Sequence, residues 1–128
     1  MSNTNYAQGG MAVVLSDQDS FRQHVRDTLV AGAGLCHPDV VRAIVQKGPA
    51  ALAELMELGV RFTQEHGGPK EGQFELGREG GHSQRRIVHA GDLTGREIER
   101  ALLAAVQGHE NITMLENHLA VDQLHESH

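Results

Sequence analysis

The first helical pattern of apolar and polar positions follows a short polar run. Phe21, Val25 and Leu29 recur four residues apart, directly after residues 16–20, which are rich in Ser and Asp. Apolar residues at this spacing line one face of a helix, and Ser or Asp in front of them is favoured as the N-cap. We therefore predict an amphipathic helix that ends at the Gly-Ala-Gly of residues 32–34. This Gly-x-Gly follows a helix rather than a strand, so it indicates a turn and not a dinucleotide-binding fingerprint.

Two further helices are predicted directly after this turn. Pro38 and Pro49 each precede a stretch of apolar residues at helical spacing, and Gly48 and Gly59 stand where each stretch stops. Proline is favoured in the first turn of a helix, where its missing N–H is not needed, and glycine is common just past the last turn. The pattern predicts one helix from Pro38 to Gly48 and another from Pro49 to Gly59, with almost no linker between them.

Short extended segments and loops are predicted in the middle of the chain. Residues 60–63 alternate in a way that predicts a short strand, and residues 64–73 contain three glycines and a proline, which indicates an exposed loop. Residues 74–77 are predicted to be extended. Residues 87–92 are predicted to be loop-like around a small apolar core.

The last third of the chain predicts a helix followed by strands. Thr94 and Glu97 have the spacing of a capping box, and the apolar stripe that follows them ends at Gly108. Residues 111–116 and 119–124 are each predicted to be a strand. A helix that leads into a strand is typical of layered α/β proteins. We therefore predict an α/β fold with several helices and few short strands.

Composition limits the class of protein. The 128 residues, 39% of them hydrophobic, are enough for at most one soluble domain. A net charge of −6 argues against wholesale binding to nucleic acid or to a membrane surface, because both favour an excess of Lys and Arg. No apolar run reaches membrane-spanning length, and the first residues lack the pattern of a signal peptide. Together with the lone Cys36, which cannot form an internal disulfide, these features lead us to expect the reducing cytoplasm.

The nine histidines do not form a metal-binding pattern. None is part of a His-x-x-x-His on a predicted helix, and no paired cysteines accompany them. We therefore predict no metal site. Cys36 has no base assigned to it and is expected to be a small apolar residue rather than a nucleophile.

Chemistry-bearing residues gather in residues 78–86. This stretch holds three arginines, Glu79, His82 and a Gly-Gly pair. Arginine forks bind carboxylates, and a carboxylate held ionised among them could bind an ammonium group. The combination suits a zwitterionic dicarboxylic acid. One alternative is a charged surface turn with Glu79 paired to its neighbours, and another is a non-enzymatic module in which the arginines bind an anion or the acidic tail of a partner protein. His82 and His89 could either donate to a carboxylate or cap the loop.

A second candidate site lies near the N-terminus. Residues 3–10 are small and polar and end in Gly9 and Gly10, before an apolar run that reaches Leu15. Their backbone could line a ligand whose polar edges need donors. A flexible end that leads into a strand explains the same pattern equally well.

Four motifs, in order along nearly the whole chain, resemble the L-aspartate oxidase family. They are Tyr-Ala-Gln-Gly-Gly at 6–10, Asp-Thr-Leu-Val-Ala-Gly-Ala-Gly-Leu-Cys at 27–36, Arg-Glu-Gly-Gly-His-Ser at 78–83 with Arg-Arg-Ile-Val-His-Ala at 85–90, and Asp-Leu-Thr-Gly at 92–95. This family belongs to the succinate dehydrogenase and fumarate reductase flavoproteins. The resemblance implies that residues 1–128 are an internal fragment of a Rossmann-like FAD-binding domain.

The same resemblance implies that parts of the domain are missing. No glycine-rich strand-to-helix fingerprint precedes Tyr6, and the segment ends before the capping domain, which carries the principal catalytic arginine and histidine in this family. We therefore assign no catalytic residue within the segment and expect it to be inactive alone. Unpaired sheet edges would favour self-association.

The resemblance also assigns binding roles by position. Glu79, with His82 and Ser83, is placed on the substrate, where Glu79 helps to orient the amino group of aspartate. The related dicarboxylate oxidoreductases have no acidic residue there, so Glu79 favours the amino-acid branch. The residues placed on the cofactor are Asn3, Thr4, Asn5, Tyr6, Ala7, Gln8, Gly9, Gly10, Leu119 and Ala120.

The implied reaction is FAD-dependent oxidation of L-aspartate to iminoaspartate, for quinolinate and NAD biosynthesis. Oxygen or fumarate would reoxidise the flavin. Covalently flavinylated relatives carry a histidine where this chain has Asn3, so the FAD is expected to be non-covalent. A fragment of a succinate- or fumarate-type oxidoreductase is the alternative within the superfamily.

Overall fold

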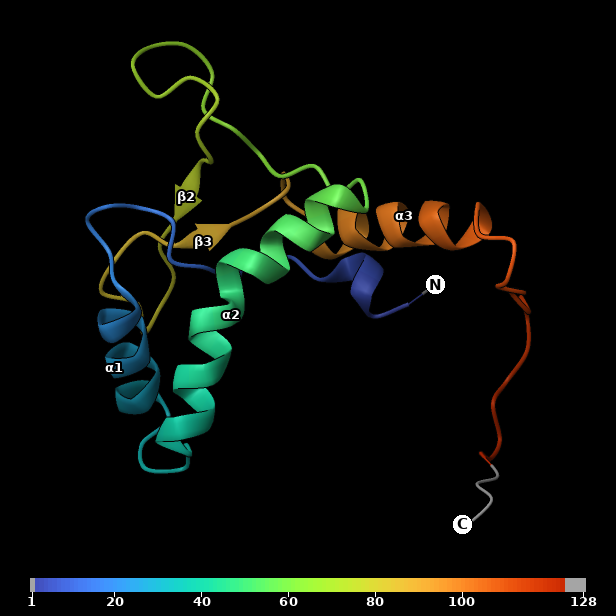
Figure 1. The fold of residues 1–128 in the computed structure, drawn as a ribbon, viewed down its shortest axis with the longest axis horizontal. Helices are drawn as coiled ribbons and strands as arrows, with labels where there is room; N and C mark the ends of the chain where they lie inside the picture. The colour runs from blue at the N-terminus through green and yellow to red at the C-terminus, as the bar shows by residue number, and fades with distance from the viewer. Residues whose placement is uncertain (1, 124–128) are drawn as a thin grey trace.

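The computed structural model describes residues 2–123 and shows helices around a small sheet (Figure 1). The prediction of an α/β fold with several helices and few short strands is confirmed. In chain order the elements are η1 (Thr4–Tyr6), β1 (Met11–Ala12), α1 (Phe21–Ala31), α2 (Pro38–Glu57), β2 (Leu76–Gly77), β3 (Ile87–Val88) and α3 (Thr94–Gln107). Figure 1 shows α1 and α2 side by side as a hairpin, with the sheet at one end of the hairpin and α3 beyond it.

The sheet has β3 at its centre. Both β1 and β2 pair with it in antiparallel register, so that Met11 and Leu76 lie opposite Val88. The ladder continues through the loop residue before β3, since Val13 N–H donates to Arg86 O at 2.8 Å and Arg86 N–H donates to Gly77 O at 3.1 Å. The prediction of a loop at residues 87–92 is therefore wrong for its first two positions. A pair of apolar residues is too short to show strand periodicity, and it becomes a strand because partners lie on both sides.

The core forms where the sheet meets α2 and α3. It contains Val13, Leu52, Val60, Phe62, Val88 and Ala101. Phe62 packs edge-to-face against Phe74, with ring centroids 6.4 Å apart. The predicted strand at residues 60–63 is not present as a strand, although Val60 and Phe62 are buried as a strand would bury them. Regular pairing in this region is limited to one isolated bridge between Gln64 and Phe74.

One continuous helix replaces the two predicted for residues 38–59. α2 runs from Pro38 to Glu57 with Pro49 in its interior, so the predicted break at residues 48–49 is wrong. An interior proline lacks the N–H of one helical bond and crowds the preceding turn, at a cost of about 3 kcal/mol. Val45 and Leu52, one on each side of Pro49, are both buried, so each half of the helix gains packing that offsets this cost. The ribbon changes direction part-way along α2 (Figure 1), as prolines commonly cause.

The start of α3 does not use the predicted capping box. Its N-cap is Leu93, without a side-chain hydrogen bond, and Thr94 Oγ1 instead accepts from Ala90 N–H at 3.1 Å. Glu97 accepts from Arg61 N–H at 2.9 Å and pairs with Arg100 at 2.7 Å. The two polar side chains are thus used to join α3 to neighbouring loops. The predicted end of the helix at Gly108 is confirmed.

The C-terminal segment is not a pair of strands. No residue from 111 to 123 belongs to a strand, so the predictions for 111–116 and for the described part of 119–124 are wrong, while Leu124 lies outside the described residues. The apolar side chains of this segment are exposed, from 38% for Met114 to 89% for Val121. In Figure 1 the segment runs away from the helices. No described strand lies beside it, and an isolated extended segment has no ladder bonds to hold it as a strand.

Candidate functional site

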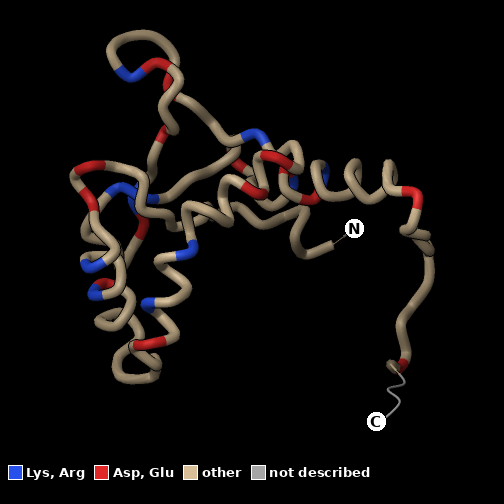
Figure 2. Tube along the Cα trace, viewed as in Figure 1, with Lys and Arg blue, Asp and Glu red and all other residues tan. Residues whose placement is uncertain are grey.

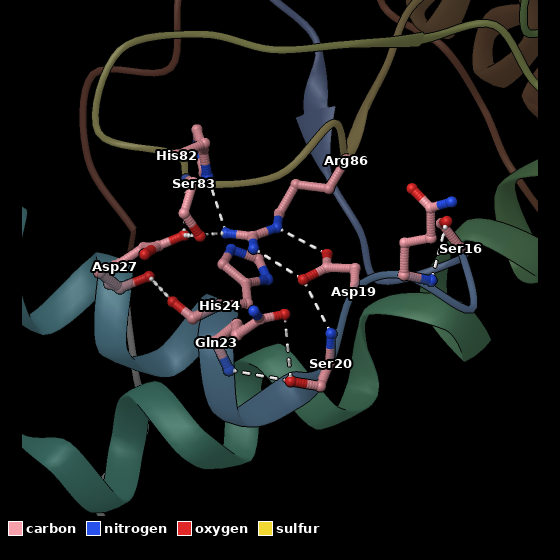
Figure 3. A network of polar contacts seen from close by, with 11 residues as sticks. Ser16, Asp19, Ser20, Gln23, His24, Asp27, His82, Ser83 and Arg86 are labelled. Atoms are coloured by element: carbon pink, nitrogen blue, oxygen red, sulfur yellow. Dashed lines mark hydrogen bonds and ion pairs between the residues drawn. The ribbon is translucent and has the colours of Figure 1, made fainter.

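A buried ion-pair network centred on Arg86 links β3 to α1. The Arg86 side chain is fully buried, and its Nε and Nη2 atoms donate to the two carboxylate oxygens of Asp19, each at 2.7 Å (Figure 3). Its Nη1 donates to Asp27 Oδ2, also at 2.7 Å. Burial alone would lower the pKa of Arg86, but the hydrogen bonds to Asp19 and Asp27 raise it. The guanidinium is therefore a permanent positive charge shared by two carboxylates.

Asp27 also holds the loop that precedes β3. Its Oδ2 accepts from Ser83 N–H at 2.8 Å and from Ser83 Oγ at 2.7 Å. Burial of Asp27 works in the opposite direction, but these bonds and the one from Arg86 lower the pKa of Asp27 to about 2. Ser83 is thus already bonded through both of its donors, so as a predicted substrate ligand it would first have to give up Asp27.

Two histidine rings complete the network. Arg86 Nη1 lies 3.2 Å from His82 Nδ1, and because a guanidinium can only donate, this nitrogen must be the acceptor and Nε2 must carry the ring proton. The His24 ring packs edge-on against His82, with centroids 5.6 Å apart. Burial, followed by the charge of Arg86, lowers the pKa of His24. Its Nδ1 is buried without a hydrogen-bond partner in the described part of the chain.

The three predicted arginines of residues 78–86 do not gather around Glu79. Arg86 is committed to the network, and Arg85 Nη1 donates to Leu76 O at 3.3 Å. Arg78 and Glu79 are both exposed and make no ion pair within residues 2–123. Glu79 is positioned through its backbone, since its carbonyl accepts from His82 N–H at 3.3 Å. Its carboxylate is therefore accessible to a ligand, but the arginines do not hold it.

Residues 3–10 lie against the N-terminal end of α3. Gly95 N–H donates to Ala7 O at 3.1 Å, and Ser2 Oγ donates to Glu99 at 2.7 Å. Gln8 and Gly9 are exposed, and their backbone N–H groups have no hydrogen-bond partner among the described residues. Two free amides on an anchored loop fit the acceptor atoms along the edge of a flavin ring, so the donor set of this segment is compatible with FAD.

The structure keeps the predicted binding residues in three separate places. The loop with Glu79, His82 and Ser83 lies next to α1, since Gly81 is beside Ala31, whereas η1 lies beside α3 (Figure 1). Leu119 and Ala120 are exposed on the C-terminal segment. One open hollow runs along residues 17–30 and another lies between Arg61 and Arg100, and neither is lined by Glu79 or by residues 3–10. The assignments of these residues to substrate and cofactor therefore stay predictions.

Charge is distributed over the molecule in both signs. Figure 2 shows basic and acidic residues interspersed along α1, the nearby loops and the start of α3. Within residues 2–123 there is no group of three or more His, Cys, Asp or Glu side chains that could hold a metal ion. No described helix is both long and apolar enough to cross a membrane.

The sequence reasoning missed Asp19, His24 and Asp27. All three were covered by the prediction of an amphipathic helix with a polar start, which assigns polar residues to solvent. One signal was present, because His24 and Asp27 are three positions apart and therefore share a face of α1. Their contacts, Arg86 for Asp27 and His82 for His24, lie about sixty residues further along the chain, and helical spacing contains no information about them.

Comparisons with known proteins agree on one group. The FAD binding domain family matches residues 1–128. The chain is 53% identical to a chloroplastic L-aspartate oxidase of Nicotiana tabacum, over 96% of this chain and 18% of the relative. It is 50% identical to the L-aspartate oxidase of Pseudomonas aeruginosa, over 97% of this chain and 24% of the relative. A mutant of E. coli quinol fumarate reductase has a similar structure, with a TM-score of 0.78 and 32% identity over 88% of this chain and 18% of that one. The chain thus spans about a fifth of the length of these relatives.

Proposed function

Because the chain belongs to the FAD binding domain family, we propose that it forms a flavin-facing and substrate-facing part of an L-aspartate oxidase. The whole enzyme would oxidise L-aspartate to iminoaspartate, which feeds quinolinate and NAD biosynthesis. The observation that carries this proposal is the 53% identity to a named L-aspartate oxidase across 96% of the chain. Residues 1–128 are then an internal segment of the FAD-binding domain.

FAD would be the acceptor for the two electrons and the hydrogen that leave the α-carbon of the substrate. The chain's own part is to bind and orient. The free amides of Gln8 and Gly9 would donate to the ring edge of non-covalently bound FAD, and Leu119 and Ala120 would approach it in the complete domain. Glu79 would accept from the ammonium group of L-aspartate, since its carboxylate is exposed and unpaired within the described residues.

His82 would bind a substrate carboxylate as a neutral donor. Its Nδ1 is used as the acceptor for Arg86, so only Nε2–H is left to donate. Ser83 would act on the substrate indirectly, by holding the loop through Asp27. The further partners we propose are an electron acceptor, oxygen or fumarate, and the rest of the same polypeptide. A cytoplasmic location stays a prediction.

A fumarate-reductase-type function is the second candidate. The structural similarity to E. coli quinol fumarate reductase supports it. The higher identity to L-aspartate oxidases and the exposed carboxylate of Glu79 favour the amino-acid substrate. A module that binds anions through three arginines is disfavoured, because Arg86 is fully buried between two carboxylates.

The proposal is tested by grafting residues 1–128 into the L-aspartate oxidase of Pseudomonas aeruginosa in place of the segment they match. The graft should retain FAD and oxidise L-aspartate, whereas the purified 128-residue chain should produce no peroxide from FAD and L-aspartate. A folded graft that retains FAD but oxidises succinate in preference to L-aspartate would support the second candidate. Steady turnover by the chain alone would refute the view that it is an incomplete part.

A further inference from the structure

The close contact between η1 and α3 depends on a residue without a side chain. Gly95 is buried in the first turn of α3, and its N–H donates to Ala7 O at 3.1 Å. A methyl group at position 95 would overlap the backbone oxygen of Thr4 and would lie 2.8 Å from Ala7 Cβ. Real Cβ atoms do not approach backbone this closely, so any other residue at position 95 would push residues 4–7 away from α3.

The other end of the same segment is anchored in the same way. A methyl group at Gly10 would overlap Ile87 Cγ2 and the backbone oxygen of Val88, so Gly10 lies directly on the central strand β3. Between these two anchors, Gln8 and Gly9 are exposed, and a methyl group at Gly9 would meet nothing within 4 Å. The segment is therefore fixed at both ends and open in the middle, where its free amides lie.

We propose that Gly95 is a positioning residue, which sets the place of the amides of Gln8 and Gly9 by letting residues 4–7 rest on the backbone of α3. This inference rests on the proposed function for its purpose, since those amides are the ones proposed to donate to FAD. The effect of Gly95 on the position of Gln8 and Gly9 does not itself require FAD. Displacing residues 4–7 by a methyl group would move Gln8 and Gly9 while Gly10 keeps its place on β3.

Two probes report on this contact. The N–H of residue 95 is in the first turn of α3, where helix amides have no partner within the helix, so its protection from hydrogen exchange should depend on Ala7 O. Tyr6 is the single tyrosine of a chain that has no tryptophan, so intrinsic fluorescence reports on η1. The matched control is Gly108→Ala at the other end of α3, where the added methyl would lie 3.6 Å from Ala104 O, an ordinary van der Waals contact.

The experiment compares the purified chain with its Gly95→Ala and Gly108→Ala variants. In Gly95→Ala, exchange of the residue-95 amide should accelerate about tenfold or more, as expected for one lost hydrogen bond. The amide signals of Gln8 and Gly9 and the Tyr6 fluorescence should shift, while the amides of Val88 and α1 keep their positions. In Gly108→Ala all of these signals should stay as in the parent chain. Equal behaviour of the two variants would overturn the inference.

A second variant covers the case in which Gly95→Ala does not fold. Ala7→Val adds bulk from the exposed loop side and leaves α3 unchanged, and it should give the same shifts at Gln8, Gly9 and Tyr6. Unchanged signals in Ala7→Val would overturn the inference too.

A parallel FAD titration separates the two proposals. If the parent chain binds FAD, the affinity of Gly95→Ala should fall about tenfold or more, and an equal affinity would overturn the inference. If the parent chain fails to bind FAD, that result counts against the proposed role of this segment, and the amide and fluorescence signals still decide the role of Gly95.

Discussion

At the scale of single residues, the molecule is organised by one buried cation and the groups that neutralise it. Arg86 uses Nε, Nη1 and Nη2 on carboxylates, and Nη1 also faces His82. Removing one member of such a buried set is costly because the remaining charges cannot return to water. We therefore expect changes in this network to lower the free energy of unfolding whether or not a ligand is bound.

The first prediction concerns the charge of Asp27. Its pKa falls from an ordinary 3.8 to about 2, which corresponds to about 2 kcal/mol of stability at neutral pH. Asp27→Asn should therefore lower the free energy of unfolding in urea by at least about this amount, since Arg86 also loses a partner. Asp17→Asn, at an exposed position beside the same helix, should change it by less than about 0.5 kcal/mol. Equal effects of the two changes would show that the Asp27 bonds add nothing to stability.

The second prediction concerns pH. The pKa of His24 is lowered from 6.5 in the folded chain. Below about pH 6.5 the unfolded chain therefore binds a proton at His24 more readily than the folded chain does, and the free energy of unfolding falls as pH falls. The pKa of Asp27 is also lowered, so its contribution is present above pH 3.8 and is lost as pH falls towards 2. In His24→Phe the loss of stability between pH 7 and 5 should be smaller, as measured by urea unfolding at each pH. His66→Gln, in the exposed loop, should keep the parental slope, and a parental slope in His24→Phe would contradict the account.

At the scale of elements, local pattern predicted the helices and failed where tertiary contacts decide. The helix after Ser20 is confirmed, and Ser20 caps it by accepting from Gln23 N–H. Local pattern predicts a helix start at Pro49 because proline is favoured in a first turn, but packing on both sides keeps Pro49 inside one helix. β3 is defined by its two partner strands, which a two-residue sequence pattern cannot reveal.

The third prediction concerns the loop between the bridge residues Gln64 and Phe74. The predicted loop is confirmed, and it holds one of the chain's two lysines, Lys70, while the other, Lys47, lies in α2. Proteases need an unfolded stretch of backbone, so exposed loop tips are cut first. An endoproteinase specific for lysine should cut the folded chain first after Lys70, as mass spectrometry of early time points would show. Initial cleavage after Lys47 would mean that α2 opens more readily than the loop.

At the scale of the whole molecule, a compact core carries a C-terminal segment with exposed apolar side chains. Leu119 and Val121 are 86% and 89% exposed, and the chain spans only 18% and 24% of the L-aspartate oxidases of Nicotiana tabacum and Pseudomonas aeruginosa. From sequence, the motifs around Glu79 and Gly9 could be found, and their roles in binding stay predictions. The contacts around Arg86 could not be predicted, because polar residues that face a ligand and polar residues that hold the fold look alike in sequence. Only the structure shows that Asp19 and Asp27 hold Arg86 and that Asp27 holds Ser83.

The central claim, that Glu79 recognises the ammonium group of an amino-acid substrate, is most directly tested by one ratio. The ratio is kcat/KM for L-aspartate divided by kcat/KM for succinate. It is measured in the graft into the Pseudomonas aeruginosa enzyme and in the same graft carrying Glu79→Gln. Losing a hydrogen bond between charged groups costs about 1.5–3 kcal/mol, so the ratio should fall by about ten- to a hundredfold, while Glu71→Gln in the exposed loop leaves it unchanged. A ratio that Glu79→Gln does not change would contradict the account.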